Sequence, residues 1–409
     1  MTRIRTVSDL DPAELEGRRL LVRVDYNVPV EPGGSIGDTT RLERTLPTLE
    51  LLVGAGARLV LVSHLGRPGG APDPAASLAP VATALSERLR MEVPLVEGDP
   101  TSSEVQEAVG DLNPGGVLLL ENIRFHAGET KNDPGLAQGL ASLVDGFVGD
   151  AFGVAHRAHA SNVGAARAIR ELGGPAVAGL LMARELHFLR DSLRSPDRPF
   201  VAIMGGAKIS GKIELIRAIL PRVDRLLVGG AMANTFFRAL GLETGDSLVE
   251  EDCVDLAGDL LEAAGEKLVL PVDCVVADRI TAEVDAVEVE RDGIEPGQRV
   301  ADVGSGSREL FVREIEGAGT VLWNGPLGVF ELEPFSRGTF RLARALADAA
   351  DRGTTVIVGG GDSAAAANAA GVADRMTHIS TGGGASLDLL AGRELPGVSV
   401  LENVDEGAE

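Results

Sequence analysis

Two lysines stand in the stretch VAIMGGAKISGKIELI, residues 201–216, which is similar to a phosphate-binding P-loop. The P-loop pattern is G-x-x-x-x-G-K-[ST], and residues 206–212 fit it until the last position, where a hydroxyl binds magnesium. That position holds Ile213, whose side chain has no lone pair for a hard cation. Either the match is a coincidence or the magnesium ligand lies elsewhere in the chain. Lys208 and Lys212 are nonetheless two of only four lysines in the sequence, which favours a role for both.

Glycine-rich turns follow the apolar runs of the second half of the sequence. They are IMGGAK, VGGAMANTF, LWNGPLGVFE, VGGGDSAAAA and STGGGASLDL. Most precede a helical pattern, so their backbone N–H groups and the helix dipoles suit a polyphosphate. Tight packing of a strand against a helix also selects glycine, so one such turn is weak evidence, whereas five indicate a nucleotide site. Asp362 in GGGDS could be a helix N-cap, or it could supply the carboxylate oxygen that Mg²⁺ prefers.

Basic and hydrogen-bonding side chains gather after the apolar runs of the first half. The motifs VRVDYNVP, DTTRLERTLP, SHLGRP, ENIRFH and DAFGVAHRAHAS contain Asp25, Asn27, Arg41, His64, Arg67, Arg124, His156, Arg157 and His159. Any one of these side chains could simply be solvated or salt-bridged. Together, the arginines offer planar forks that bind phosphate or carboxylate in a bidentate manner. We therefore expect a pocket for a small, highly anionic molecule rather than a zinc site, because no histidine has a partner at zinc-like spacing.

Short runs rich in Val, Leu and Ile must position these motifs. The runs are RLLVRVD, ARLVLVS, GVLLLE, GFVGD, FVAIMGG, RLLVGG, TVLWNG and TTVIVGG. Each is followed by a helical pattern, which predicts an α/β fold with parallel sheets covered by helices on both faces. Ligands of such sheets bind beyond the carboxyl ends of the strands. Residues 173–199 contain a long amphipathic pattern, which predicts one helix between two lobes; the alternative is an internal helix of a single large sheet.

The 409 residues carry 61 acidic and 38 basic side chains, a formal net charge of −23. Such a charge repels nucleic acid and anionic lipid, so we expect neither as a partner. No window approaches the roughly 18 apolar residues of a membrane span, and the first residues lack a signal-like apolar core, so we expect a cytoplasmic protein. Cys253 and Cys274 match no disulfide framework or zinc motif. The excess of acidic residues over lysine is typical of proteins from cells that accumulate salt.

Taken together, these motifs resemble those of phosphoglycerate kinases along nearly the whole chain. The matching stretches are VRVDYNVP, SHLGRP, LLENIRF, DAFGVAHRAHAS, IMGGAKISGKI, GGAMANTF, WNGPLGVFE, GGGDSAAA and STGGGASL, in the family's order. The resemblance implies two Rossmann-like parallel-sheet lobes of three αβα layers, joined by a helix, with a cleft between them. It implies a 3-phosphoglycerate lobe at residues 1–172, a helix and hinge at 173–199, and a nucleotide lobe at 200–390. The segment 391–409 would return toward the first lobe, with a frayed acidic end.

The same resemblance implies the members of the site. The acid-substrate residues would be Asp25, Asn27, Arg41, His64, Arg67, Arg124 and Arg157. The nucleotide residues would be Lys208, Lys212, Asn324, Pro326, Glu331, Gly360, Gly361, Asp362 and Ser363, with Glu331 at the ribose and Asp362 on Mg²⁺. The implied partners of a monomer are 3-phosphoglycerate, 1,3-bisphosphoglycerate, ATP and ADP. Two positions depart from the commoner pattern, since Gly211 stands where many members carry Asp and Ser305 where proline is frequent.

The implied reaction is reversible phosphoryl transfer between 1,3-bisphosphoglycerate and ADP, in glycolysis and gluconeogenesis. Its attacking carboxylate is already ionised at pH 7, since a carboxyl pKa lies near 4, so no general base is required. Catalysis would depend on in-line positioning and on cancellation of charge by Arg41, Lys208 and Lys212.

Two alternative functions are a dehydrogenase and a non-catalytic nucleotide-binding protein. A Rossmann-type dehydrogenase would need a G-x-G-x-x-G motif in the first βα unit, where VRVDYNVP stands instead. A non-catalytic nucleotide-binding relative of the same fold is the second rival. It is disfavoured because Arg41, Lys208, Lys212 and Asp362 are all present.

Overall fold

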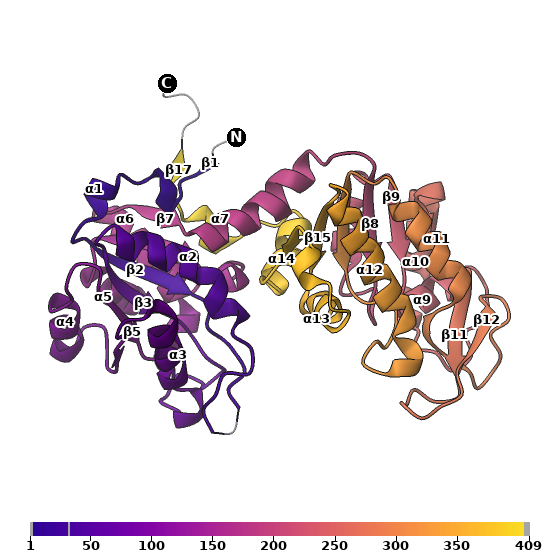
Figure 1. The fold of residues 1–409 in the computed structure, drawn as a ribbon, viewed down its shortest axis with the longest axis horizontal. Coiled ribbons are helices and arrows are strands. Elements are labelled where there is room, and N and C mark those ends of the chain that lie inside the picture. Colours follow the sequence, from indigo (N-terminus) through magenta and orange to yellow (C-terminus); the bar gives the residue numbers. More distant parts are fainter. Residues whose placement is uncertain (1–2, 32, 405–409) are drawn as a thin grey trace. The chain divides into compact units, whose positions relative to one another are not determined.

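A computed structural model describes residues 3–31 and 33–404, and these fold into two compact units. Unit 1 comprises the described residues up to His187 together with those from Glu394 onward, and unit 2 comprises Phe188–Arg393. Figure 1 shows the elements of each unit. The acidic end of the sequence, residues 405–409, for which we expect fraying, lies outside the described residues.

Unit 1 is built on a six-stranded sheet in the order β4-β5-β3-β2-β6-β7, and every neighbouring pair is parallel. The strands are β2 (Arg19–Val24), β3 (Arg58–Val62), β4 (Leu95–Val96), β5 (Val117–Leu120), β6 (Gly146–Asp150) and β7 (Ala176–Ala178). Residues 20–24 of the central strand β2 are all buried. A parallel strand that helices cover on both faces is expected to show this pattern.

The helices of unit 1 are α1 (Pro12–Leu15), α2 (Thr40–Gly54), α3 (Ala79–Leu89), α4 (Ser103–Gly110), α5 (Pro134–Ser142), α6 (Ala165–Glu171), α7 (Leu180–Leu186) and α15 (Pro396–Ser399). Leu20, Val22 and Val24 of β2 share one core cluster with the leucines of α2 and α3. On the β6–β7 side, α6 contacts both strands and packs against α5. The ends of the described chain meet here as well, because β1 (Arg3–Ile4) pairs antiparallel with β17 (Asn403–Val404).

Unit 2 repeats the plan with a parallel six-stranded sheet in the order β10-β9-β8-β14-β15-β16. The strands are β8 (Phe200–Met204), β9 (Arg225–Val228), β10 (Leu268–Val269), β14 (Thr320–Asn324), β15 (Thr355–Gly359) and β16 (His378–Ile379). A smaller antiparallel sheet adds β11 (Asp273–Ala277), β12 (Val287–Glu290) and β13 (Arg299–Val303) in the order β12-β11-β13.

The helices of unit 2 are α8 (Ile213–Ile219), α9 (Met232–Ala239), α10 (Val254–Ala264), α11 (Ser305–Ile315), α12 (Arg337–Asp351), α13 (Gly361–Ala369) and α14 (Gly384–Leu390). Fully buried Trp323 of β14 lies in one core cluster with Phe311 of α11, Leu346 of α12 and Ala366 of α13. These three helices therefore cover one face of the sheet, while α8 packs against α14 and α9 against α10.

The α/β class with two parallel sheets is confirmed, and the alternative of a single large sheet is wrong. All eight apolar runs form the predicted strands β2, β3, β5, β6, β8, β9, β14 and β15. The predicted helical segment 173–199 differs at its start, since Ala176–Ala178 is strand β7 beside β6. The helix begins at Leu180 and continues as a π-helical turn over His187–Ser192. Within the described part of the chain, none of the helices has the length and apolar character that crossing a membrane requires.

Asp150 ends β6 and is fully buried. Its Oδ1 accepts a hydrogen bond of 3.0 Å from the backbone N–H of Met182 in the first turn of α7. Burial raises the pKa of Asp150 to about 7. The carboxyl group therefore keeps its proton in the folded protein at pH values where an unfolded chain has lost it.

We expect Asp150 to make the folded state less stable as the pH rises. The folded pKa lies above the unfolded value of about 3.9, so stability from this group is complete below pH 4 and is lost up to about pH 7. Between roughly pH 5.5 and pH 8 the loss is on the order of 2 kcal/mol. Urea unfolding of Asp150→Asn at both pH values should show a weaker pH dependence than the wild type. The exposed-site control Asp111→Asn should keep the wild-type dependence, and an unchanged dependence in Asp150→Asn would contradict the expectation.

Candidate active site

The predicted acid-substrate residues of unit 1 follow the carboxyl ends of neighbouring strands. Asp25 follows β2, His64 follows β3, Arg124 follows β5 and Arg157 follows β6. The strand order runs outward from β2 in one direction through β3 and in the other through β6, so β2 and β6 flank a topological switch point. Open parallel sheets bind their ligands at such points.

Asp25 connects two of these side chains. Its Oδ2 accepts a hydrogen bond of 2.6 Å from Arg41 Nη1, and its Oδ1 lies 3.8 Å from His64 Nδ1. Asp25 and His64 are buried, while the Arg41 side chain keeps about a third of its surface exposed. Asp25 therefore holds Arg41, whose side chain stays partly open to a ligand.

The SHLGRP loop is fixed at Gly66 from two sides. Gly66 N–H donates to Asn27 Oδ1 at 2.9 Å, and the Gly66 carbonyl accepts from Arg124 Nη1 at 2.6 Å. Asn27 and Arg124 thus hold the backbone that carries Arg67.

A cavity of about 470 Å³ is lined by Arg67, Arg124 and Arg157, together with Lys131 and His126. Within residues 3–31 and 33–404, neither the three arginines nor Lys131 lies within 4 Å of a carboxylate oxygen. Four cationic groups without a carboxylate partner thus line one cavity of a chain whose net charge is −23. The cavity therefore suits an anion that carries several charges. Lys131 and His126 were not singled out by their motifs.

Two buried charged groups of unit 1 were missed by the sequence analysis. Arg23 of β2 is 1% exposed, and Glu129 is fully buried. Burial, with the charges of Arg23 and Arg124, lowers the pKa of His159 to about 4 and holds the pKa of His64 far below its usual range. Both imidazoles are therefore neutral at pH 7. The sequence could have indicated that Arg23 is buried, because this arginine lies inside the apolar run RLLVRV.

In unit 2, Lys212 joins two neighbouring strand ends. Its Nζ donates to the carbonyl of Gly205 at 2.6 Å, after β8, and to the carbonyl of Asn324 at 2.8 Å, the last residue of β14. The strands β8 and β14 flank the switch point of this sheet, because β9 and β10 lie beyond β8 on the other side. Burial lowers the pKa of Lys212 to about 8, although the Asp362 carboxylate opposes this shift. Lys208, by contrast, is exposed.

The turn before α13 is tied to the end of β14. Asn324 Nδ2 donates to the Gly359 carbonyl at 3.0 Å, and Ser363 Oγ accepts from Gly325 N–H at 2.6 Å. Gly360 has a φ of +90°, a conformation that favours glycine, and it is the N-cap of α13. Asp362 lies in the first helical turn and is exposed, so it is not the N-cap, and its carboxylate is available to a ligand.

A cavity of about 710 Å³ gathers other predicted nucleotide residues, namely Pro326, Glu331 and Asp362. It is also lined by residues that the sequence analysis did not name, among them Gly206, Gly230, Leu327 and Val329. Gly206 N–H donates to the Pro326 carbonyl at 2.8 Å, and Gly230 N–H to the Leu327 carbonyl at 3.0 Å. Three glycine turns thus converge on one cavity. Lys208, Lys212, Asn324, Gly360, Gly361 and Ser363 are not among its lining residues.

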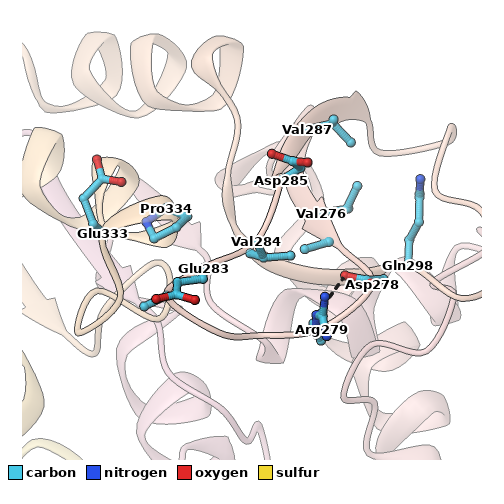
Figure 2. A pocket seen from close by; sticks show the side chains of 12 residues that line it. Val276, Asp278, Arg279, Glu283, Val284, Asp285, Val287, Gln298, Glu333 and Pro334 are labelled. Carbon is cyan, nitrogen blue, oxygen red and sulfur yellow. Dashed lines mark ion pairs between the residues drawn. The ribbon is translucent and has the colours of Figure 1, made fainter.

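A second cavity of unit 2, of similar volume at about 740 Å³, contains none of the predicted residues. Figure 2 shows that its lining carries the acidic side chains of Asp278, Glu283, Asp285 and Glu333, with Arg279 paired to Asp278. The cavity near Pro326 is lined by as many carboxylates, so acidity does not distinguish the two; the cavity near Pro326 differs in that the glycine turns converge on it. Size alone therefore does not identify the nucleotide site.

The two positions that depart from the family pattern are accommodated locally. A side chain at Gly211 would meet no atom within 4 Å of its Cβ. Ser305 is the first residue of α11, and its N–H donates to Glu288 Oε2 at 2.9 Å, a bond that proline could not make. The second departure is thus matched by a specific partner.

Comparison with known proteins gives one family. The family model described as phosphoglycerate kinase matches residues 8–393. The phosphoglycerate kinase of Thermus thermophilus is 52% identical over 402 residues, covering 98% of this chain and 100% of the relative. That of Chloroflexus aurantiacus is 51% identical over 406 residues, covering 98% and 99%. The solved structure of phosphoglycerate kinase from Coxiella burnetii matches with a TM-score of 0.88 and 40% identity over 97% of this chain and 98% of that chain.

Substitutions at Gly205 and Gly211 should differ in their effect on stability, because Gly205 is closely packed and Gly211 faces open space. A Cβ at Gly205 would overlap the carbonyl oxygen of Pro326, so Gly205→Ala should destabilise the protein by about 1–3 kcal/mol. Gly211→Asp should change stability by less than about 0.5 kcal/mol. Denaturant midpoints of both variants measure this difference. Equal midpoints would show that the turn does not pack as described.

Proposed function

The chain belongs to the phosphoglycerate kinase family, and we propose that its two strand-edge sites hold the two substrates of that reaction. The enzyme is a phosphotransferase that moves a phosphoryl group reversibly between 1,3-bisphosphoglycerate and ADP, forming 3-phosphoglycerate and ATP. The observation that supports this assignment of sites best is the cavity of unit 1, whose arginines have no carboxylate partner in an acidic chain.

Unit 1 holds the phosphoglycerate in this proposal. Arg67, Arg124 and Arg157 line the cavity and bind anionic oxygens through charge-assisted hydrogen bonds. The remaining members are Asp25, Asn27, Arg41 and His64, of which Asp25 orients Arg41. The neutral His64 offers a hydrogen bond without adding charge.

Unit 2 holds the nucleotide. The lining of the cavity beside Pro326 and Glu331 includes apolar side chains such as Leu248, Leu327 and Val329, which suit a base. The turns that contain Gly360, Gly361 and Ser363 offer backbone N–H groups, and Lys208 offers an exposed ammonium group, to the phosphates. Lys212 and Asn324, which are joined by a hydrogen bond, are the remaining members of the proposed nucleotide site.

Asp362 fits the part of a magnesium ligand. Mg²⁺ bound to a nucleotide takes one or two carboxylates, with phosphate oxygens and water as the other ligands. Asp362 is an exposed carboxylate that borders the nucleotide cavity in the first turn of α13. The bound ion would supply neutralisation of the phosphate charge.

The chain's own contribution is to position the reactants and to cancel charge. The attacking carboxylate of 3-phosphoglycerate is already ionised, so no side chain has to remove a proton. A lysine ammonium has three donors, and Lys212 uses two of them on the carbonyls of Gly205 and Asn324. The third donor remains for an oxygen of the transferred phosphoryl group. Arg41, which belongs to the acid-substrate site, also cancels negative charge on this group.

A coupled assay that follows conversion of 3-phosphoglycerate and ATP to the acyl phosphate tests the proposed function. Turnover that needs both substrates and Mg²⁺ supports it. Binding of MgATP without turnover would instead support a non-catalytic nucleotide-binding relative. Turnover with other acids but not with 3-phosphoglycerate would contradict the assignment of unit 1.

Lys212→Ala should lower kcat by about a hundredfold or more, because one preorganised charge is worth about 3 kcal/mol in the transition state. The thermal midpoint should stay near that of the wild type, since the lysine side chain is only partly buried. Lys267→Ala, in the same unit but outside the site, is the matched control. The charge of Lys212 is lost as the pH rises through about 8, so nucleotide kcat/KM should fall there. An unchanged kcat in Lys212→Ala would remove this residue from the mechanism.

We further propose that the two units of this enzyme close when both substrates bind, which would bring donor and acceptor together and exclude water. The π-helical turn at His187–Ser192 is the proposed hinge, because such turns often mark functional positions in helices. We propose that the enzyme is a cytoplasmic monomer. Small-angle scattering with and without both substrates should show a smaller radius of gyration when both are bound. The same data give the molecular mass, and an unchanged radius of gyration would contradict closure.

A further inference from the structure

Arg23 lies beneath the acid-substrate site, 1% exposed, in the central strand β2. Its guanidinium makes three contacts. Nε donates to Ser161 Oγ at 2.8 Å, Nη1 donates to the Val24 carbonyl, and Nη2 lies 3.3 Å from His64 Nδ1. A buried arginine that contacts a site residue without lining the cavity has a role other than direct binding.

We propose that Arg23 is a positioning residue that fixes His64 as a neutral imidazole with its proton on Nε2, ready to donate to the bound acid substrate. The inference rests on the proposed function, because it takes His64 to be part of the phosphoglycerate site. It adds which nitrogen of His64 carries the proton and what holds it there.

The direction of the Arg23–His64 hydrogen bond follows from the donor inventory. A guanidinium has five N–H donors and no acceptor. His64 Nδ1 must therefore accept from Arg23 Nη2, and the single proton of the neutral ring is placed on Nε2. The competing partner of Nδ1 is Asp25 Oδ1, which at 3.8 Å lies beyond hydrogen-bond reach.

The charges around His64 keep the ring neutral. Arg23, Arg124 and Arg41 face it, with His159 and Asp25 also nearby. Burial and the three arginines outweigh Asp25, so the pKa of His64 lies far below its usual range. Within the described residues Nε2 makes no hydrogen bond, and it is not one of the fully buried unpaired atoms. Its N–H is therefore available to a ligand.

A second set of contacts orients the guanidinium. Ser161 donates to Glu129 through Oγ at 2.7 Å and through its backbone N–H at 2.9 Å. Since the Ser161 hydroxyl proton is used on Glu129, its lone pair accepts from Arg23 Nε. Residues from four separate segments thus act in series, from Glu129 through Ser161 and Arg23 to His64. Such a series fixes a rotamer more firmly than one bond does.

A purely structural role for Arg23 is the alternative. In that case its charge would balance Glu129 and Asp25, and the tautomer of His64 would not depend on it. The position of the imidazole proton separates the two roles, and it can be observed in the free enzyme without any substrate.

Nitrogen NMR of the enzyme labelled with ¹⁵N-histidine reads the tautomer directly, and His64→Gln identifies the signal among the six histidines. The wild type should show a pyrrole-type Nε2 and a pyridine-type Nδ1, unchanged between about pH 5 and pH 8. A proton on Nδ1, or titration of His64 in this range, would overturn the proposal even if no Arg23 variant folds.

Arg23→Met removes the donors and keeps an unbranched side chain of similar length. His64 should then lose its fixed tautomer, and 3-phosphoglycerate affinity, measured by calorimetry without nucleotide, should fall about tenfold. MgATP affinity should stay within about twofold. The control Arg19→Met lies on the same strand, where Arg19 pairs with Asp145, and should leave the His64 signal and 3-phosphoglycerate binding unchanged.

An Arg23→Met variant with the wild-type tautomer and affinity would overturn the proposal. Failure of the wild type to bind 3-phosphoglycerate would count against the proposed function instead. In that event the NMR comparison would still decide whether Arg23 sets the tautomer of His64.

Discussion

Parallel pairing of the central strands is the constraint on which the rest of this enzyme depends. In unit 1, β2 lies between β3 and β6, and in unit 2, β8 lies between β9 and β14. Parallel strands end at the same edge, so the residues that follow each strand must lie close together even when they are far apart in sequence. Asp25, His64 and Arg124 meet in this way, and so do Gly205 and Asn324 around Lys212. The chemistry of each unit thus follows from which residue stands just beyond a buried strand.

Burial decides which of these groups carry charge. The chain is strongly acidic, yet arginines gather in the site of unit 1 and two of the four lysines belong to the proposed site of unit 2; burial lowers the pKa of His64 and of Lys212. His64 becomes a neutral donor, while Lys212 stays charged near pH 7 but close to its titration. Asp362 is exposed and the Arg41 side chain keeps about a third of its surface exposed, so both can meet a ligand from solvent. Each unit therefore combines a group whose pKa is lowered by burial with an exposed or partly exposed group in the same proposed site.

Much of this arrangement could be predicted from the sequence, because long apolar runs and the residues that follow them are local signals. The eight main strands were found in this way, together with the cationic cluster and the glycine turns. The short edge strand at Ala176–Ala178 was taken for helix, since three apolar residues do not distinguish the two. Arg23 and Glu129 were missed because their importance lies in being buried together, which depends on tertiary packing. The acidic cavity near Asp278 likewise has no motif.

The pairing of β1 with β17 has a consequence for biosynthesis. Arg3 lies opposite Val404 and Ile4 opposite Asn403, so unit 1 is assembled from both ends of the described chain, and unit 2 is a continuous insertion within it. A ribosome delivers residues in order, and unit 2 is complete once Arg393 has emerged. Among the described strands, β1 is synthesised before all the others and must wait for β17, the last of them. Unit 1 therefore cannot form its β1–β17 pair until all of unit 2 has been synthesised.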